Sequence, residues 1–243
     1  MPPEFSSVAA DLAPSATLRA AINLGNPVLV PPSPGEPTGV TVDIAAEVAR
    51  RLEVAVELLP FSGAKKSFEA VVEGRADLCF LAVEPARAAE VSFTAPYVVI
   101  EGVYAVAENS PITAAEDVDR PGVRIAVKEG SAYDLYLTRS LGSAGLIRSD
   151  EGIGDYQQGK ADVVAGIRQP ITAFVGEHPG HRVLEPAFTQ IKQALGVSKD
   201  RAPETVAFLD ALIEELKATG FIAESLRRSG REASLVAPPG SAR

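Results

Sequence analysis

The sequence is poor in the residues that build redox, metal and nucleophilic sites. Its 243 residues include one cysteine, no tryptophan and two histidines, His178 and His181. A single cysteine excludes an internal disulfide and a zinc site of the CxxC type. Both histidines lie in a Gly- and Pro-rich stretch, 176–181, which predicts an exposed loop. We therefore expect no metal and no cofactor, and the composition argues against a catalytic triad.

The lone cysteine, Cys79, lies within the apolar run 78–83. Such a run is typical of a buried strand, where a thiol acts as a small apolar side chain. We expect Cys79 to be buried and not to be a nucleophile.

Long hydrophobic runs are also missing, because none approaches the roughly 20 residues that a membrane span requires. The first residues lack the basic start and the apolar core of a secretory signal. We expect a periplasmic or extracellular protein if a signal was removed, and a cytoplasmic one if Met1 is the true start.

The charge is acidic, with 32 Asp and Glu against 23 Lys and Arg and a formal net charge of -9. This balance disfavours nucleic acids and anionic membranes as partners. It does not disfavour a small anion, because solvent screens distant charges over roughly 10 Å and a local arginine then dominates. We expect a monomer that binds a small molecule and no nucleic acid.

Short β-branched apolar runs alternate with segments of helical periodicity, which predicts an α/β fold. The predicted strands are 18–24, 54–59, 77–83, 123–127, 161–165 and 193–197, and the predicted helices are 42–52, 67–73, 133–141, 203–219 and 221–229. The phrase 73–78, in which a helix ends at a glycine before a basic residue, Ala, Asp and a strand, recurs at 158–163. The repeat suggests two lobes built on one plan, with flexible ends over the first dozen residues and 238–241.

Two unbroken extended runs, 97–106 and 191–198, would cross between the lobes. A chain that crosses twice forms a two-stranded hinge, which commonly supports domain closure around a ligand. We predict a discontinuous lobe 1 over 1–104 and 193–243, and lobe 2 over 105–192.

Several phrases occur in an order that carries a family resemblance over residues 17–230. They are Thr17–Ala21, Gly39–Ala45, Gly74–Leu78, Pro85–Tyr97, Gly122–Val127 and Lys128–Ala132. In this order they resemble the family 3 extracellular solute-binding proteins, the amino-acid-binding type of periplasmic binding protein. The resemblance implies a type II periplasmic-binding-protein fold with two hinge crossover strands.

The resemblance also implies a ligand site. Arg87 would be the main contact, since a guanidinium pairs bidentately with a carboxylate; the alternative is a surface arginine that pairs with Glu84 or Glu90. Ser131 and Ala132 would offer backbone N–H groups and a hydroxyl to the same carboxylate, or form an ordinary helix N-cap. Asn23 and Asn26 would line the mouth of the site or only make a turn. Glu84, which shortly precedes Arg87 in the sequence, is a further candidate ligand-binding residue.

One departure concerns the ammonium group of an amino acid. The aspartate that would accept it is expected near Gly166 and is missing. Arg168 stands close by and would favour another anionic or hydrogen-bonding group, while Glu101 would replace the lost carboxylate or form part of the hinge surface. The ligand is therefore expected to be an α-amino acid or a carboxylate without the amine.

The resemblance implies a non-enzymatic binding protein that closes over a small carboxylate-bearing solute for an ABC-type transporter, with an ABC permease as partner. Two alternatives stay open, a cytoplasmic ligand sensor and an enzyme like cyclohexadienyl dehydratase. The enzyme would need a general acid, for which Glu84 and Glu101 are the candidates.

Overall fold

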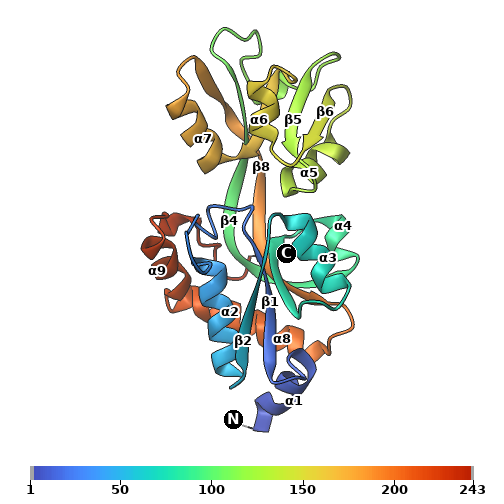
Figure 1. The fold of residues 1–243 in the computed structure, drawn as a ribbon, viewed down its shortest axis with the longest axis vertical. Coiled ribbons are helices and arrows are strands. Elements are labelled where there is room, and N and C mark those ends of the chain that lie inside the picture. The colour runs from blue at the N-terminus through green and yellow to red at the C-terminus, as the bar shows by residue number, and fades with distance from the viewer. Residues whose placement is uncertain (1–2, 242–243) are drawn as a thin grey trace. The chain divides into compact units, whose positions relative to one another are not determined.

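The computed structural model describes residues 3–241, which form two compact units (Figure 1). Unit 1 comprises the chain up to Val99 and from Lys192 onward, and unit 2 comprises Ile100–Ile191. In each unit helices pack against a sheet, as expected for an α/β protein. Within the described residues, no helix is both long and apolar enough to cross a bilayer.

Unit 1 is built on a sheet with the strand order β2-β1-β3-β8. The first three strands are parallel and β8 lies antiparallel to β3. The strands are β1 (Thr17–Asn23), β2 (Ala55–Phe61), β3 (Leu78–Ala82) and the end of β8 (His181–Ser198). The helices are α1 (Pro3–Leu12), α2 (Val40–Arg51), α3 (Ala64–Val72), α4 (Pro85–Ala88), α8 (Pro203–Ala218) and α9 (Phe221–Arg228), with the short turn η2 (Ala233–Leu235).

Unit 2 repeats this plan with the strand order β4-β7-β5-β6. Strands β5 (Arg124–Lys128), β6 (Gly145–Ser149) and β7 (Val163–Ile167) are parallel, and β4 (Val91–Ala107) lies antiparallel to β7. The helices are α5 (Ala132–Ser140), α6 (Gly152–Gln157) and α7 (Arg168–Glu177), with the short turn η1 (Ala115–Asp117).

Two strands carry the chain from one unit to the other. The boundary between the units falls after Val99 within β4 and after Ile191 within β8. The predicted extended runs 97–106 and 191–198 lie inside these two strands.

The repeated phrase has the same backbone form in both units. Gly74 and Gly159 follow α3 and α6 with φ of 71° and 72°, in the left-handed region that favours glycine. The aspartate that follows each glycine donates its backbone N–H to a neighbouring parallel strand. Asp77 donates to Arg19 O of β1 at 2.8 Å, and Asp162 donates to Arg124 O of β5 at 2.9 Å. The phrase therefore ends a helix and aligns the next strand.

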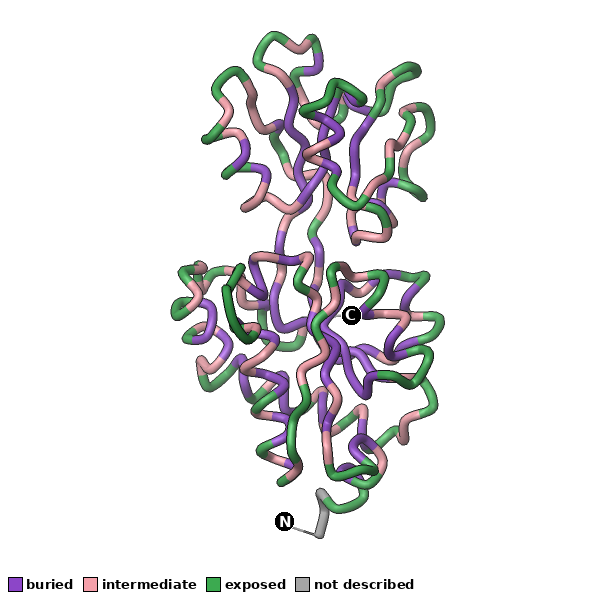
Figure 2. Tube along the Cα trace, viewed as in Figure 1, coloured by how far each residue is buried: buried purple, intermediate pink, exposed green. Residues whose placement is uncertain are grey.

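Both faces of the unit 2 sheet are buried. Tyr104 and Val106 of β4 belong to one apolar cluster with Ile125, whereas Val103 and Ala105 belong to another with Ala126. This alternation follows from the period of two along a strand, and the buried segments run through the middle of the unit in Figure 2. In unit 1 the predicted helical face of α2 is buried as well, through Ile44, Val48 and Leu52.

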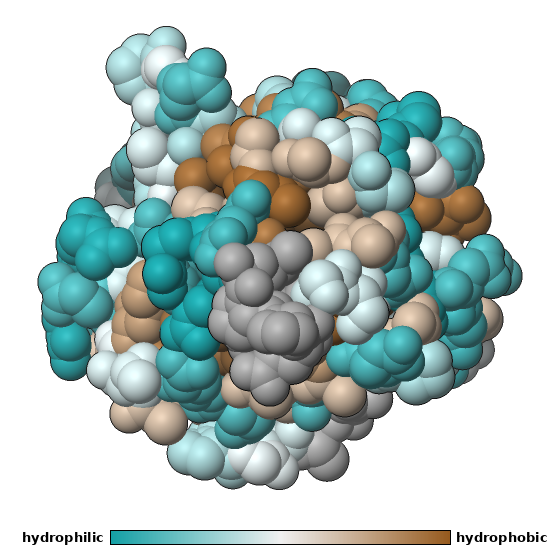
Figure 3. All heavy atoms as spheres, turned by 90° about the horizontal axis from the view of Figure 1, so that it is seen from below, coloured by the Kyte–Doolittle hydropathy of each residue, from teal (hydrophilic) through white to brown (hydrophobic). Residues whose placement is uncertain are grey.

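The first dozen residues, for which we expect a flexible end, contain the packed helix α1. Helix α1 buries Val8, Ala9 and Leu12, and the Asp11 carboxylate accepts hydrogen bonds from Ala202 N at 3.1 Å and Thr205 Oγ1 at 2.6 Å. Short apolar segments can thus be ordered by packing, although they lack the length of a stable isolated helix. Seen from the end at which α1 lies, hydrophilic residues cover most of the visible surface, with hydrophobic residues between them (Figure 3).

Candidate ligand-binding site

Nearly all candidate residues follow the carboxyl ends of parallel strands. In unit 1, Asn23 ends β1 and Glu84 follows β3; in unit 2, Ser131 follows β5 and Arg168 follows β7. Parallel strands end at a common edge of their sheet, and ligands of open α/β sheets bind at that edge. The candidates of each unit therefore share one edge of its sheet. Glu101 on the antiparallel strand β4 lies at the same edge, because Gly102 pairs with Ile167 at the end of β7.

The main candidate, Arg87, is buried within the short helix α4. Arg87 is only 3% exposed, and its Nη1 donates to the Ala82 carbonyl at 3.2 Å. Burial lowers the pKa of the guanidinium to about 10, and the charge of Glu84 opposes this change. Arg87 therefore stays cationic at neutral pH. The interpretation as a surface arginine is wrong, because both Arg87 and Glu84 are buried.

The two asparagines of the loop after β1 each stabilise a turn. Asn23 Oδ1 accepts from Gly25 N at 3.0 Å, and Asn26 Oδ1 accepts from Val28 N at 3.2 Å. Asn26 is buried and Asn23 is half-buried. These bonds use the carbonyl side of each amide, which is typical of an Asx turn.

Ser131 is the N-cap of α5. Its hydroxyl accepts from Asp134 N at 3.1 Å, which satisfies one of the helix's first N–H groups. Within the described part of the chain, the backbone N–H groups of Ala132 and Tyr133 have no hydrogen-bond partner. Two donors at the amino end of a helix form a favourable environment for a carboxylate.

Arg168 pairs with two glutamates in unit 2. Its Nε donates to Glu101 Oε2, and its Nη1 and Nη2 donate to the two oxygens of Glu185 at 2.5 and 2.9 Å. The bond to Glu185 raises the pKa of Arg168 and lowers that of Glu185. Three of its donors are thus already engaged, which disfavours the expected role of Arg168 in binding an anionic group. Glu101 is 42% exposed at its side chain.

Gly166 lies on β7 opposite Val103, and the space beside it is filled. A Cβ atom at this position would lie 2.9 Å from both Cγ1 and Cδ1 of Ile171, which is fully buried. A side chain at position 166 therefore requires Ile171 to move. The packing of α7 against β7 thus fills the space that a carboxylate side chain at position 166 would need.

A comparison with protein families identifies the family of this chain. The model of the bacterial extracellular solute-binding proteins, family 3, matches residues 18–230. The chain belongs to this family. No curated protein matches the sequence.

Solved structures share the fold of this solute-binding protein at low sequence identity. The cysteine-binding protein from Campylobacter jejuni is 20% identical with a TM-score of 0.79, over 97% of this chain and 100% of that one. A mutant of ArgBP from T. maritima is 20% identical with a TM-score of 0.76, over 92% and 99%. The ancestral amino acid-binding protein AncCDT-1, a precursor of cyclohexadienyl dehydratase, is 20% identical with a TM-score of 0.74, over 92% and 98%. The predicted type II fold is confirmed.

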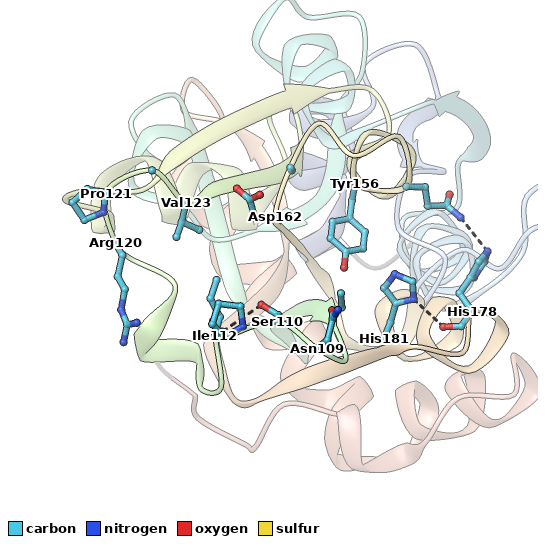
Figure 4. Close-up of a pocket in the computed structure, with 15 residues that line it drawn as sticks. Asn109, Ser110, Ile112, Arg120, Pro121, Val123, Tyr156, Asp162, His178 and His181 are labelled. Carbon is cyan, nitrogen blue, oxygen red and sulfur yellow. Dashed lines mark hydrogen bonds between the residues drawn. The ribbon is translucent and has the colours of Figure 1, made fainter.

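The solute-binding protein also has a hollow that the sequence does not suggest. It lies within unit 2, has a volume of about 940 Å³ and is shown in Figure 4. Both histidines contribute to it, and each is half-buried rather than fully exposed in a loop. Its residues come from four separate segments, 107–112, 120–123, 156–162 and 178–181, so that no local motif could identify it.

Cys79 is fully buried, as expected, and its Sγ lies 3.6 Å from the Gly196 carbonyl. Burial raises the pKa of its thiol to about 12, so that the reactive thiolate is disfavoured at neutral pH. Among the residues that the structure describes, no group of three or more His, Cys, Asp and Glu side chains is arranged to hold a metal ion.

Proposed function

We propose that this solute-binding protein binds a small carboxylate-bearing molecule through Arg87 and delivers it to an ABC-type permease outside the cytoplasm. The observation that supports this proposal is the buried guanidinium of Arg87, which stays charged at the strand edge where ligands of α/β sheets bind. A ligand carboxylate can accept two parallel hydrogen bonds from a guanidinium, and such a bidentate pair is both strong and specific in its geometry.

We propose that the amino end of α5 is a second contact for the ligand carboxylate. The N–H groups of Ala132 and Tyr133 would donate to the ligand carboxylate, and the Ser131 hydroxyl would hold the helix end in place. Asn23 and Asn26 would shape the loop, since their amide oxygens are already used in turns.

Among small carboxylate-bearing molecules, we propose that an α-amino acid is the ligand. The cluster of Arg168, Glu101 and Glu185 carries two negative charges against one positive charge. Its net negative charge favours a cationic group on the ligand. The relatives named for cysteine binding, for arginine (ArgBP) and for amino acid binding agree with this class.

A binding screen tests the proposal. Thermal unfolding is measured with the twenty amino acids, their keto acids, aromatic acids and dicarboxylates. A ligand at about 100 times its Kd stabilises the folded state by about 2.7 kcal/mol, which raises Tm by roughly a few degrees. We expect the largest shift with an amino acid, and a larger shift than with the matching keto acid. Turnover of prephenate would instead favour the dehydratase alternative.

Two variants locate the site. Arg87→Lys keeps the charge but loses the planar fork, and Arg87→Met keeps the approximate volume without the charge. We expect Arg87→Lys to weaken binding and Arg87→Met to abolish it. The matched control is Arg75→Met, an arginine of the same unit that is 49% exposed at its side chain and pairs with Glu73. A ligand whose affinity is the same in all three variants would place the site elsewhere.

A further inference from the structure

The hollow in unit 2 lies at the sheet edge opposite the candidate ligand residues. Val123 precedes β5, and Ala161 and Asp162 precede β7, so that the hollow opens where these parallel strands begin. Ser131 and Arg168 follow the same two strands at their carboxyl ends. Strands of this length separate the two edges by roughly 15 Å. The hollow is therefore distinct from the proposed carboxylate site.

The two histidines of the hollow are held in one orientation each. His178 Nδ1 lies 2.9 Å from the Phe174 carbonyl, and His181 Nδ1 lies 2.9 Å from the His178 carbonyl. A carbonyl oxygen only accepts, so both Nδ1 atoms carry a proton, and in the neutral form of each ring Nε2 presents a lone pair. The Gln157 amide lies 3.0 Å from Nε2 of His178.

Three hydrogen-bonding groups around the hollow have no partner within the described residues: the Asn109 amide, the Tyr156 hydroxyl and Nε2 of His181. Figure 4 shows Asn109 beside His181 and the Tyr156 hydroxyl directed toward them. The rings of Tyr156 and His181 are in edge contact, with centroids 5.6 Å apart. These groups form a small polar cluster at one end of the hollow.

The charged residues of the hollow are already neutralised. Arg120 pairs with Asp117, and Asp162 pairs with Arg124 through bonds of 2.8 and 3.0 Å. The remaining wall is largely apolar and includes Ile112, Val123 and Ala161. A charged ligand would find no spare counter-charge among these residues to offset the loss of its hydration. An uncharged ligand would lose little free energy of hydration.

We infer that this hollow is a second small-molecule site, and that its ligand is an uncharged ring that bears hydroxyl groups. A hydroxyl both donates and accepts, so it satisfies the His181 lone pair as well as the Tyr156 hydroxyl and the Asn109 amide. The carbon side of such a ring packs against Ile112, Val123 and the aromatic edge of Tyr156. A pocket with an apolar wall and a few convergent polar groups is the usual form of a small-molecule site, and 940 Å³ lies in the usual size range.

Glucose and myo-inositol are suitable probes, in titrations of the full chain followed by amide NMR spectra. We expect saturable shifts at Asn109, Val123, Tyr156 and Ala161. Tyr156→Phe removes only the hydroxyl and His181→Phe keeps a ring against Tyr156 and Phe174; each is expected to weaken binding by about tenfold. Tyr136→Phe, a tyrosine of α5 in the same unit that packs on Phe188, is the control and should not change the affinity.

The outcomes separate this site from the carboxylate site. Arg87→Met should leave the binding of glucose or myo-inositol unchanged, and Tyr156→Phe should leave amino acid binding unchanged. Spectra without saturable shifts would overturn the inference, as would shifts that both hollow variants retain. Tighter binding of glucose 6-phosphate or glucosamine than of glucose would show that the ligand is charged. Thermal unfolding of each variant checks that it folds.

Discussion

The carboxylate of Asp77 accepts three hydrogen bonds from Arg19, at 2.8 Å from the backbone N, 3.1 Å from Nε and 2.8 Å from Nη2. Asp162 and Arg124 repeat this arrangement in unit 2, at 3.0, 3.0 and 2.8 Å. Each aspartate therefore joins the start of one strand to the neighbouring strand. The two copies differ in burial, because the Asp77 side chain is 1% exposed and the Asp162 side chain is 43% exposed.

This difference predicts unequal costs for the same substitution. Asp77→Ala removes the buried carboxylate that Arg19 and Arg201 share and should lower the free energy of unfolding by about 3 kcal/mol. Asp162→Ala breaks an exposed pair and should cost less than about 1 kcal/mol beyond the loss of its backbone bond. Urea unfolding of the two variants measures both values. Equal costs would show that burial does not set the strength of the motif.

Only some of the strands and helices can be predicted from the sequence. Strands with continuous apolar runs, such as Leu78–Ala82, are predicted well because every residue is buried. Strand β6, Gly145–Ser149, escapes prediction because it is partly exposed at the sheet edge and has no continuous run. Helix α7 escapes prediction because a proline in a sequence usually indicates a turn. Here Pro170 stands at the third position of the helix, where a missing N–H is tolerated.

The site is predictable only in part. A motif can single out Arg87, but its burial and its bond to Ala82 depend on the packing of α4. The pairing of Arg168 with Glu101 joins residues that are 67 positions apart, and no local pattern indicates it. The role of Gly166 likewise depends on Ile171, which fills the space that a side chain would need.

Substitution of Gly166 tests that packing. Gly166→Ala places a methyl group within 2.9 Å of Ile171 and should cost about 1–3 kcal/mol of stability. In an Ile171→Ala background the same change should cost less, because the clashing atoms are gone. Gly176→Ala is the control on α7, since nothing lies within 4 Å of its added carbon and alanine favours a helix. A Gly166→Ala variant as stable as Gly176→Ala would contradict the contact.

Acid sensitivity should depend on Asp119. The backbone N–H groups of Gly142, Ala144 and Ser143 donate to its carboxylate, each at 2.8 Å, and lower its pKa. A pKa lower in the folded state than in the unfolded state stabilises the fold above the unfolded value, about 3.9, and this stabilisation is lost as the pH falls through the folded value. Asp119→Asn should therefore be less stable than the wild type at pH 7, with a smaller difference at pH 3.

Urea unfolding at the two pH values measures this effect, and Asp150→Asn is the control. Asp150 is an exposed carboxylate of the same unit, and its substitution should change stability little at either pH. If the difference between Asp119→Asn and the wild type were the same at pH 3 and pH 7, the carboxylate charge would not be the cause.

Ser131 links the stability of unit 2 to the proposed ligand contact. Ser131→Ala removes the cap of α5 and should cost about 1 kcal/mol in urea unfolding. The same variant should bind the amino acid ligand more weakly, because the frayed helix end no longer holds the N–H groups of Ala132 and Tyr133 in place. Ser131→Thr keeps the hydroxyl and should restore both properties, the stability as measured by urea unfolding and the affinity as measured by calorimetric titration. If Ser131→Ala lost stability but kept the full affinity, the end of α5 would serve only as a cap, and the carboxylate would be bound elsewhere.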